Sequence, residues 1–213
     1  YYLNSNRKQR YFSTYWSYSI TQDAVAQGYV YDKTTGVRTY RPENVNGNYN
    51  IGGNVNYSMP LDKARRLTLN SGLWSRLYNS VDLISVTDGM APARSTVQTY
   101  NSGGSLNMEY AFPKDVRVGV KARCTWNHLS SGRENFTTLN TYDYNYGLIA
   151  QAKLPWDLQF NTDLTLYSRR GYGESGMNTD DIVWNATLSK KLLKKRVTLS
   201  LDGFDILGQL SNV

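Results

Sequence analysis

The chain has 213 residues, is 40% hydrophobic and 13% aromatic, and carries a formal net charge of +7 at pH 7. Its single cysteine, Cys124, excludes an internal disulfide and a cysteine-based metal site. No apolar stretch approaches the roughly 18 residues of a spanning helix, which excludes helical membrane insertion but leaves a strand-built wall open. The basic residues are dispersed over turns and single strand positions, so we expect no nucleic-acid partner.

Tyrosine is the most unusual feature of the composition, with 18 residues beside 5 tryptophans and 17 glycines. A membrane barrel wall explains this mixture, because half of its residues face lipid and the other half face a wet lumen. A soluble, tyrosine-rich β-sandwich is the alternative on composition alone.

Apolar and polar residues alternate along most of the chain, and successive strand residues point to opposite faces, so the pattern predicts strands. The expected strands are, in chain order, residues 11–26, 48–59, 67–77, 96–112, 116–126, 136–154, 158–167, 182–188 and 197–207. Several of these expected strands are longer than the roughly 9–11 residues that a tilted membrane-crossing strand needs. Residues 1–3 are the expected end of one more strand.

The expected connections alternate between short and long. Short, turn-coded links are expected at 60–63, 113–115, 155–157 and 190–196, and longer polar links at 31–45, 78–94, 129–135 and 169–180. Outer-membrane barrels have short periplasmic turns and long extracellular loops, whereas a sandwich with Greek-key crossings has no reason to alternate. The sequence therefore predicts an all-β fold, an antiparallel up-and-down transmembrane β-barrel of about nine strands.

Aromatic residues stand near both ends of the expected strands. Tyr110, Phe112 and Trp156 flank short turns, while Trp126 and Trp184 lie near long loops. Tyrosine and tryptophan favour the two membrane interfaces, although aromatic residues also suit strands in general.

Three basic residues share one face of the strand at 116–126. Arg117, Lys121 and Arg123 alternate there with apolar residues such as Val118 and Val120. We expect the three to line the lumen, where charges tune what passes. The alternative is that they form ion pairs with Asp163 or Asp143 on neighbouring strands.

The last third of the chain resembles a known family. Residues 182–192 (Ile-Val-Trp-Asn-Ala-Thr-Leu-Ser-Lys-Lys-Leu), 196–200 (Arg-Val-Thr-Leu-Ser) and 205–207 (Asp-Ile-Leu) are similar to the hairpin near the C-terminus of TonB-dependent-receptor-like outer-membrane barrels, of the SusC type. Residues 50–59, followed by Pro60-Leu61-Asp62, also resemble those barrels.

The resemblance implies a location in the cell outer membrane and the import of a bulky nutrient. It also implies several partners: outer-membrane lipid, the remaining barrel strands, a plug domain, the inner-membrane energy-coupling protein TonB and a surface lipoprotein. A non-transport barrel that serves as a scaffold or surface-binding module is the alternative. The family's plug, its energy-coupling box and its final strand are not found in residues 1–213, so we expect an incomplete barrel segment whose outermost strands pair elsewhere.

Catalysis is the third possibility that the sequence raises. His128 is the only histidine, and Ser130 and Ser131 follow it closely. A barrel enzyme with its catalytic groups at the outer rim would use a serine as nucleophile and the histidine as base. A loop histidine in water is the better interpretation. Asp180 and Asp181 are adjacent strand residues on opposite faces, which argues against a shared cation. We therefore expect no enzymatic activity, no cofactor and no metal.

Overall fold

The computed structural model describes residues 1–5, 8–84, 93–133, 136–193 and 196–210. Twelve strands account for most of that part, and its one helical element is a single 3₁₀ turn, η1, at Ser175–Met177. Within it, no helix is long and apolar enough to span a membrane. The expected all-β fold is confirmed. Residues 85–92, 134–135 and 194–195, which belong to the expected links at 78–94, 129–135 and 190–196, lie outside the described residues.

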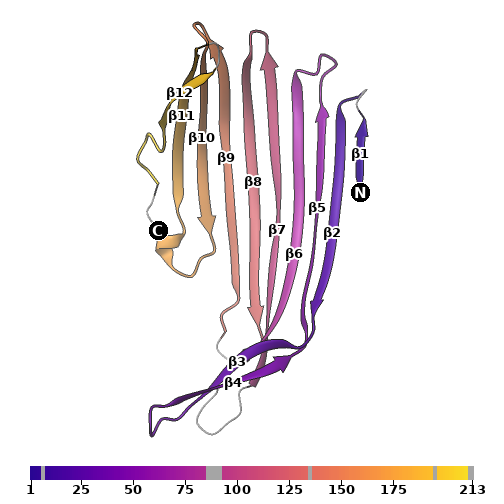
Figure 1. Ribbon diagram of the computed structural model, residues 1–213, viewed down its shortest axis with the longest axis vertical. Coiled ribbons are helices and arrows are strands. Elements are labelled where there is room, and N and C mark those ends of the chain that lie inside the picture. The colour runs from indigo at the N-terminus through magenta and orange to yellow at the C-terminus, as the bar shows by residue number, and fades with distance from the viewer. Residues whose placement is uncertain (6–7, 85–92, 134–135, 194–195, 211–213) are drawn as a thin grey trace.

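Ten strands form one antiparallel sheet in which sequence neighbours are also spatial neighbours, apart from a single insertion after the second strand. Figure 1 shows them as a long, curved wall. The strands of this sheet are β1 (Tyr2–Ser5), β2 (Arg10–Thr21), β5 (Asn48–Pro60), β6 (Leu67–Ile84), β7 (Ala93–Phe112), β8 (Val116–Ser131), β9 (Leu139–Leu154), β10 (Leu158–Arg170), β11 (Asp180–Leu192) and β12 (Val197–Gly203).

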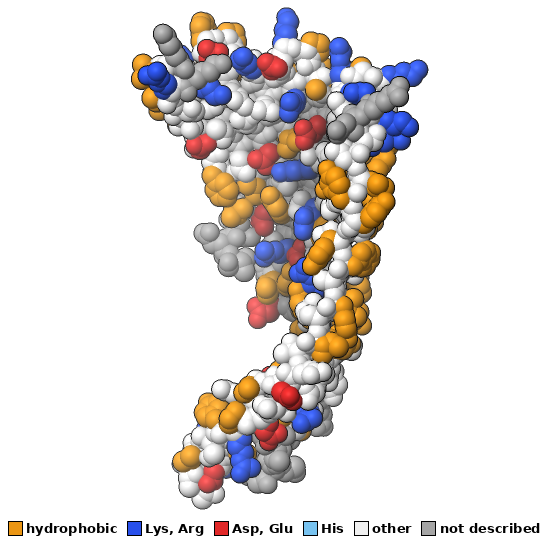
Figure 2. All heavy atoms as spheres, turned by 45° about the vertical axis from the view of Figure 1, so that its right-hand side comes forward, with side chains coloured by type: hydrophobic (Ala, Val, Ile, Leu, Met, Phe, Trp, Pro, Cys, Tyr) orange, Lys and Arg blue, Asp and Glu red, His pale blue; other side chains and the backbone are white. Residues whose placement is uncertain are grey.

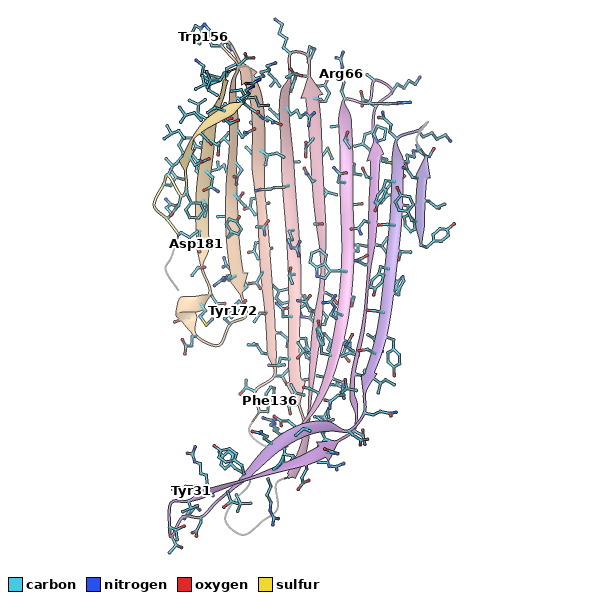
Figure 3. All side chains as sticks on the ribbon, viewed as in Figure 1. Tyr31, Arg66, Phe136, Trp156, Tyr172 and Asp181 are labelled. Carbon is cyan, nitrogen blue, oxygen red and sulfur yellow. The ribbon has the colours of Figure 1, made fainter. Side chains whose placement is uncertain are left out.

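The short turns lie where the sequence predicts them. In the β7–β8 turn both Lys114 and Asp115 have positive φ, 69° and 58°, and in the β9–β10 turn Trp156 and Asp157 have 62° and 56°. Two central residues with positive φ make the turn whose twist matches that of the flanking strands. Figure 3 shows Trp156 and Arg66 at this end of the sheet and Tyr172 toward the other.

The link between β6 and β7 is shorter than the sequence predicts. The link between β8 and β9 is shifted to 132–138, because β9 begins at Leu139 and not at the expected residue 136. β6 continues to Ile84 and β8 continues to Ser131, past the expected strand ends at residues 77 and 126. The alternation of apolar and polar residues fades there, but the backbone pairing does not, since Asp82 still faces Ser95 and Val97 still faces Ser131. The strands therefore extend beyond the apolar part of the wall.

The expected long link at 31–45 is instead a two-stranded hairpin, β3 (Ala24–Tyr31) and β4 (Arg38–Val45). The expected strand at 11–26 ends at Thr21 because the chain bends at Asp23 (φ 51°), facing a second bend at Gly47 (φ 111°). The Asp23 N–H donates to the Asn46 side chain at 2.7 Å, which holds the bend.

This hairpin, here called the arm, leaves the long-loop ends of β2 and β5 and projects away from the sheet (Figures 1 and 2), with β3 in contact with β6. Its base is fixed by a small apolar core in which Ala26 and Val45 pack against Leu83 of β6. Two-stranded hairpins are marginal in water without such packing.

The last expected strand also ends early, at Gly203 rather than at residue 207. Asp205 adopts positive φ, and its carboxylate accepts the N–H groups of Gln209 and Leu210 at 3.1 and 2.9 Å. The aspartate side chain thus satisfies backbone donors locally, in competition with the strand ladder.

The two faces of the sheet differ in chemistry. On one face large apolar side chains are exposed, among them Trp16 (66%), Leu73 (64%) and Leu148 (59%). Strand alternation and register place Lys121 and its charged and amide-bearing neighbours on the other face. Figure 2 shows Lys, Arg, Asp and Glu side chains gathered in the hollow of the curved sheet, with hydrophobic side chains along its outer border.

The apolar face of β7 is long enough to cross a membrane at the tilt that is usual in barrels. Tyr100 and Tyr110 lie on this face of β7, ten residues apart. At about 3.3 Å per residue and a tilt of about 40°, they are roughly 25 Å apart along the membrane normal, the height of the apolar band of outer-membrane barrels. Tyr110 packs edge-on against Phe112 near the short turns.

We predict that the apolar face contacts lipid and that the Lys121 face contacts water. In a Cys124→Ser background, a membrane-impermeant thiol reagent should label Lys121→Cys faster than Val120→Cys, because these neighbours point to opposite faces. Labelling rates are measured by mass spectrometry in membranes, with detergent-denatured protein as the control. Faster labelling of position 120 would reverse the two faces.

Candidate lumen-facing site

The predicted residue Lys121 forms an ion pair. Its Nζ lies 3.2 Å from Oδ2 of Asp163, two strands away on β10, with both side chains about one-third exposed. Gly147 stands between them on β9, opposite Lys121 on one side and Thr165 on the other. Because glycine has no side chain, the lysine can cross the intervening strand. The ion-pairing alternative is therefore confirmed for Lys121.

Asp163 gathers further donors around this ion pair. The Thr165 hydroxyl donates to Oδ2 at 3.2 Å, and the Asn185 amide donates to Oδ1 at 3.4 Å. The carboxylate therefore has one cationic partner and two neutral ones, so the local charge is balanced across β8 to β11.

The predicted residue Arg123 has a different environment. Its guanidinium carbon lies 4.0 Å from the centroid of the Trp74 ring, a cation–π arrangement. On Gly103 a Cβ would come within 2.3 Å of the same ring, so the indole lies directly against the glycine backbone. Gly103, Trp74 and Arg123 thus form a stack on the hollow side of the sheet.

The predicted residue Arg117 lies nearer the short turns. It lines a hollow of about 270 Å³ together with Glu109, Gln151, Asn161 and Asp163. Both signs of charge border this hollow, and among the described residues no ion pair or side-chain hydrogen bond engages the Arg117 guanidinium. The three predicted residues share one face, but each has a distinct set of neighbours.

A second polar cluster lies at the long-loop end. Tyr172, from the β10–β11 loop, donates its hydroxyl to both carboxylate oxygens of Asp143, at 2.8 and 3.0 Å. Asn127 donates to Asp143 at 3.4 Å. Burial, followed by the hydrogen bond to Asp143, raises the pKa of the Tyr172 phenol. Asn178 braces the loop by bonding the backbone of Tyr172 in both directions.

His128 belongs to the apolar face. Its Nδ1 lies 2.7 Å from the Asn140 side-chain oxygen, and its ring lies 5.8 Å from both Tyr100 and Trp126. This aromatic group lies toward the long-loop end of β7 and β8. In the part of the chain that the structure describes, no group of three or more His, Cys, Asp or Glu side chains is arranged to hold a metal ion.

The sequence analysis missed Trp74 and Arg76 on β6. The strand at 67–77 was predicted, and both residues share its polar face with Asn70. A glycine lies opposite each of these residues, Gly103 opposite Trp74 and Gly52 opposite Arg76. Glycine, which has no side chain, lets the large side chain of its partner lie flat on the sheet, so these glycines are the sequence signal for the two residues.

Comparison with known protein families matches residues 93–212 to the outer membrane protein beta-barrel family. That match covers more than half of the chain. The chain belongs to this family. The matched region begins with β7 and includes Arg117, Lys121 and Arg123. Neither the curated proteins nor the solved structures contain a match to the chain.

Membership of the outer membrane protein beta-barrel family assigns the chain to the outer membrane, as the sequence predicts. It also agrees with the geometry described above: antiparallel strands, short turns at one end, long connections at the other and one apolar face. The chain therefore contributes barrel wall.

We predict that Gly147→Ala destabilises the folded barrel. The new Cβ would lie 2.3 Å from the Leu164 carbonyl oxygen and 2.8 Å from the Thr165 hydroxyl, so the backbone must shift. Overpacking of this kind costs about 1–3 kcal/mol. The temperature at which the folded band is lost on a detergent gel should fall. Gly173→Ala is the matched control, since nothing lies within 4 Å of its Cβ. Equal loss in both variants would contradict the steric account.

We predict that Tyr172 titrates above the ordinary range of a tyrosine, because burial and the Asp143 carboxylate both disfavour the phenolate. With a raised folded-state pKa, its stabilisation of the loop is present below the unfolded-state value and is lost as pH rises through the folded-state value. Carbon-13 tyrosine NMR measures this titration, with Tyr172→Phe assigning the signal. Asp143→Asn should lower the pKa. A Tyr172 titration at or below the ordinary range would refute the interpretation.

Proposed function

We propose that this chain forms part of the wall of a TonB-dependent-type receptor that imports a bulky nutrient through the outer membrane. The observation that carries the proposal is a sheet of ten neighbouring strands whose borders, β1 and β12, do not pair with each other in the described residues. A barrel of about eight strands has an interior that side chains already fill. A wall in which ten strands still form an open arc belongs to a wider lumen.

The open borders support the same conclusion. In hydrocarbon, each unpaired backbone N–H or C=O group costs several kcal/mol, so an exposed sheet edge is not tolerated. The outer edges of β1 and β12 therefore pair with strands from other parts of the full protein. The complete barrel then has more than ten strands, enough to enclose a large ligand or a plug.

The hollow side of the wall also suits passage of a polar solute. It carries many small polar residues, such as Asn54, Ser105 and Asn107, among a few charged ones. The resemblance of residues 182–207 to TonB-dependent receptors supplies the rest of the proposal: a plug domain, coupling to TonB and a surface lipoprotein as partners. No catalytic role is part of it, since His128 lies between aromatic rings on the apolar face.

One observation favours a second candidate, a barrel that binds at the cell surface without transport. The arm projects from the long-loop end and exposes Tyr31 (40%) and Tyr40 (60%). Arg38 lies over the rings of Tyr29 and Tyr31 at 5.4 and 5.8 Å, so the arm presents a preformed aromatic and basic surface. Such a surface serves a binding module as well as a receptor.

The test compares three strains: wild type, a deletion of the gene that encodes the full protein, and a deletion of TonB. Compounds that wild-type cells remove from a complex medium are identified by mass spectrometry. A transporter predicts large compounds whose removal stops in both deletion strains and returns when the gene is restored. A protonophore should stop their removal in wild-type cells.

Removal that needs the barrel but neither TonB nor the proton gradient would contradict energised import. Normal removal in the gene deletion, combined with lost binding of a ligand or cell at the surface, would favour the second candidate. Replacing residues 24–45 by a short turn separates the two functions, because it deletes the arm and leaves the ten-stranded wall intact.

A further inference from the structure

A second hollow on the charged face, of about 280 Å³, lies between β2 and β8. Its polar lining comes from five strands and includes Ser17, Asn54, Trp74, Arg76 and Arg123. Two arginines border this hollow, and none of its described lining residues is acidic. The hollow beside Arg117 differs in this respect, because Glu109 and Asp163 border it.

Arg123 is held in place without an acidic partner. Its guanidinium lies 4.0 Å from the Trp74 centroid, and the indole is itself held against Gly103. Stacking on an aromatic face engages the plane of the guanidinium and leaves the N–H groups at its rim available.

Arg76 is fixed in a similar way. Its Nη1 donates to the Tyr78 hydroxyl at 2.9 Å, and its guanidinium carbon lies 5.8 Å from the Tyr78 ring centroid. A Cβ on Gly52 would come within 3.1 Å of Arg76 Cγ and Nε, so the arginine stem lies over the glycine. Both arginines therefore reach the hollow in orientations set by neighbouring rings and glycines.

Neither guanidinium has an ion-pair partner among the described residues. The contrast with Lys121, on the same face, is direct, because Asp163 balances that charge. Two guanidinium groups without an ion-pair partner in the described part of the chain thus line one hollow together with amide and hydroxyl neighbours. Arginine donates two parallel hydrogen bonds to anionic oxygen groups, so the chemistry of this lining suits such a group.

We propose that Arg76 and Arg123 form a binding site for an anionic group of the ligand, a carboxylate, sulfate or phosphate. This inference rests on the proposed function and specifies its substrate class as a bulky, polar nutrient that carries such a group. Asn54 and Ser17 supply neutral hydrogen-bonding groups at the border of the hollow. Positive charge in the lumen raises the local concentration of anions, and the oriented arginines give the group a defined position.

The test uses the full protein, purified and folded in detergent, with citrate and inorganic sulfate as probes and sucrose as the neutral control. Binding is measured by isothermal calorimetry and by tryptophan fluorescence, because an anion on Arg123 changes the surroundings of the Trp74 ring. Saturable binding of citrate, weaker binding of sulfate and no binding of sucrose are expected. In Trp74→Phe the fluorescence signal should vanish, while calorimetry still detects binding.

The decisive variants are Arg76→Gln and Arg123→Gln, each expected to weaken citrate binding at least about tenfold, since a charge-assisted hydrogen bond is lost. Arg117→Gln, with the same change of charge outside this hollow, should alter binding less than about twofold. Arg123→Lys keeps the charge but loses the planar fork, and should lie in between. The folded band on a detergent gel verifies that each variant is folded.

Equal weakening by Arg117→Gln would mean general charge attraction and would overturn the site. Absence of citrate binding in the wild type would overturn it too, as would a structure of the full protein in which its own acidic side chains pair with both arginines. These outcomes are separable from failure of the proposed function. Citrate binding without energised uptake would support the anion site and reject the import function. Energised uptake that neither Arg76→Gln nor Arg123→Gln changes would support import and reject the anion site.

Discussion

The structure depends on one constraint: inside a membrane, every backbone N–H and C=O group must find its partner within the protein. A meander of antiparallel strands meets this requirement strand by strand, and here the ladder is continuous from β1 to β12. Side chains are then free to differ between the two faces, because they do not contribute to the pairing. An exposed apolar face and a polar, hollow face are the result.

The polar face shows what small residues contribute to a wall of this kind. Gly147 lets Lys121 reach Asp163 across β9, and Gly103 gives Trp74 a flat support. A glycine on a neighbouring strand therefore accompanies both the Lys121–Asp163 ion pair on one side of β8 and, on the other side, Arg123, which has no ion-pair partner among the described residues. The distribution of acids decides the difference, since Asp163 lies beside one hollow and no described acid lies beside the other.

Much of this fold is readable from the sequence because its signals are local. Alternation along residues 116–126 places Arg117, Lys121 and Arg123 on one face, and Pro113-Lys114-Asp115 marks its turn. The arm was missed because two strands bend at once, and Asp23 and Gly47 are far apart in sequence. Nor could the sequence identify the partners of Lys121 and Arg123. These partners lie up to 49 residues away in sequence, and their contacts depend on the register between strands. Alternation of apolar and polar residues does not determine that register.

We infer that these ten strands form an open arc of a wider barrel. This inference is tested most directly by pulsed electron resonance between spin labels at Leu3→Cys on β1 and Leu199→Cys on β12, in the full protein without Cys124. Val120→Cys with Leu148→Cys, an opposed pair on neighbouring strands, is the short-distance control. For an open arc we expect a β1–β12 distance several times the neighbouring-strand spacing of about 4.8 Å. A distance equal to that of the control pair would mean that the ten strands close on themselves, and would contradict this inference.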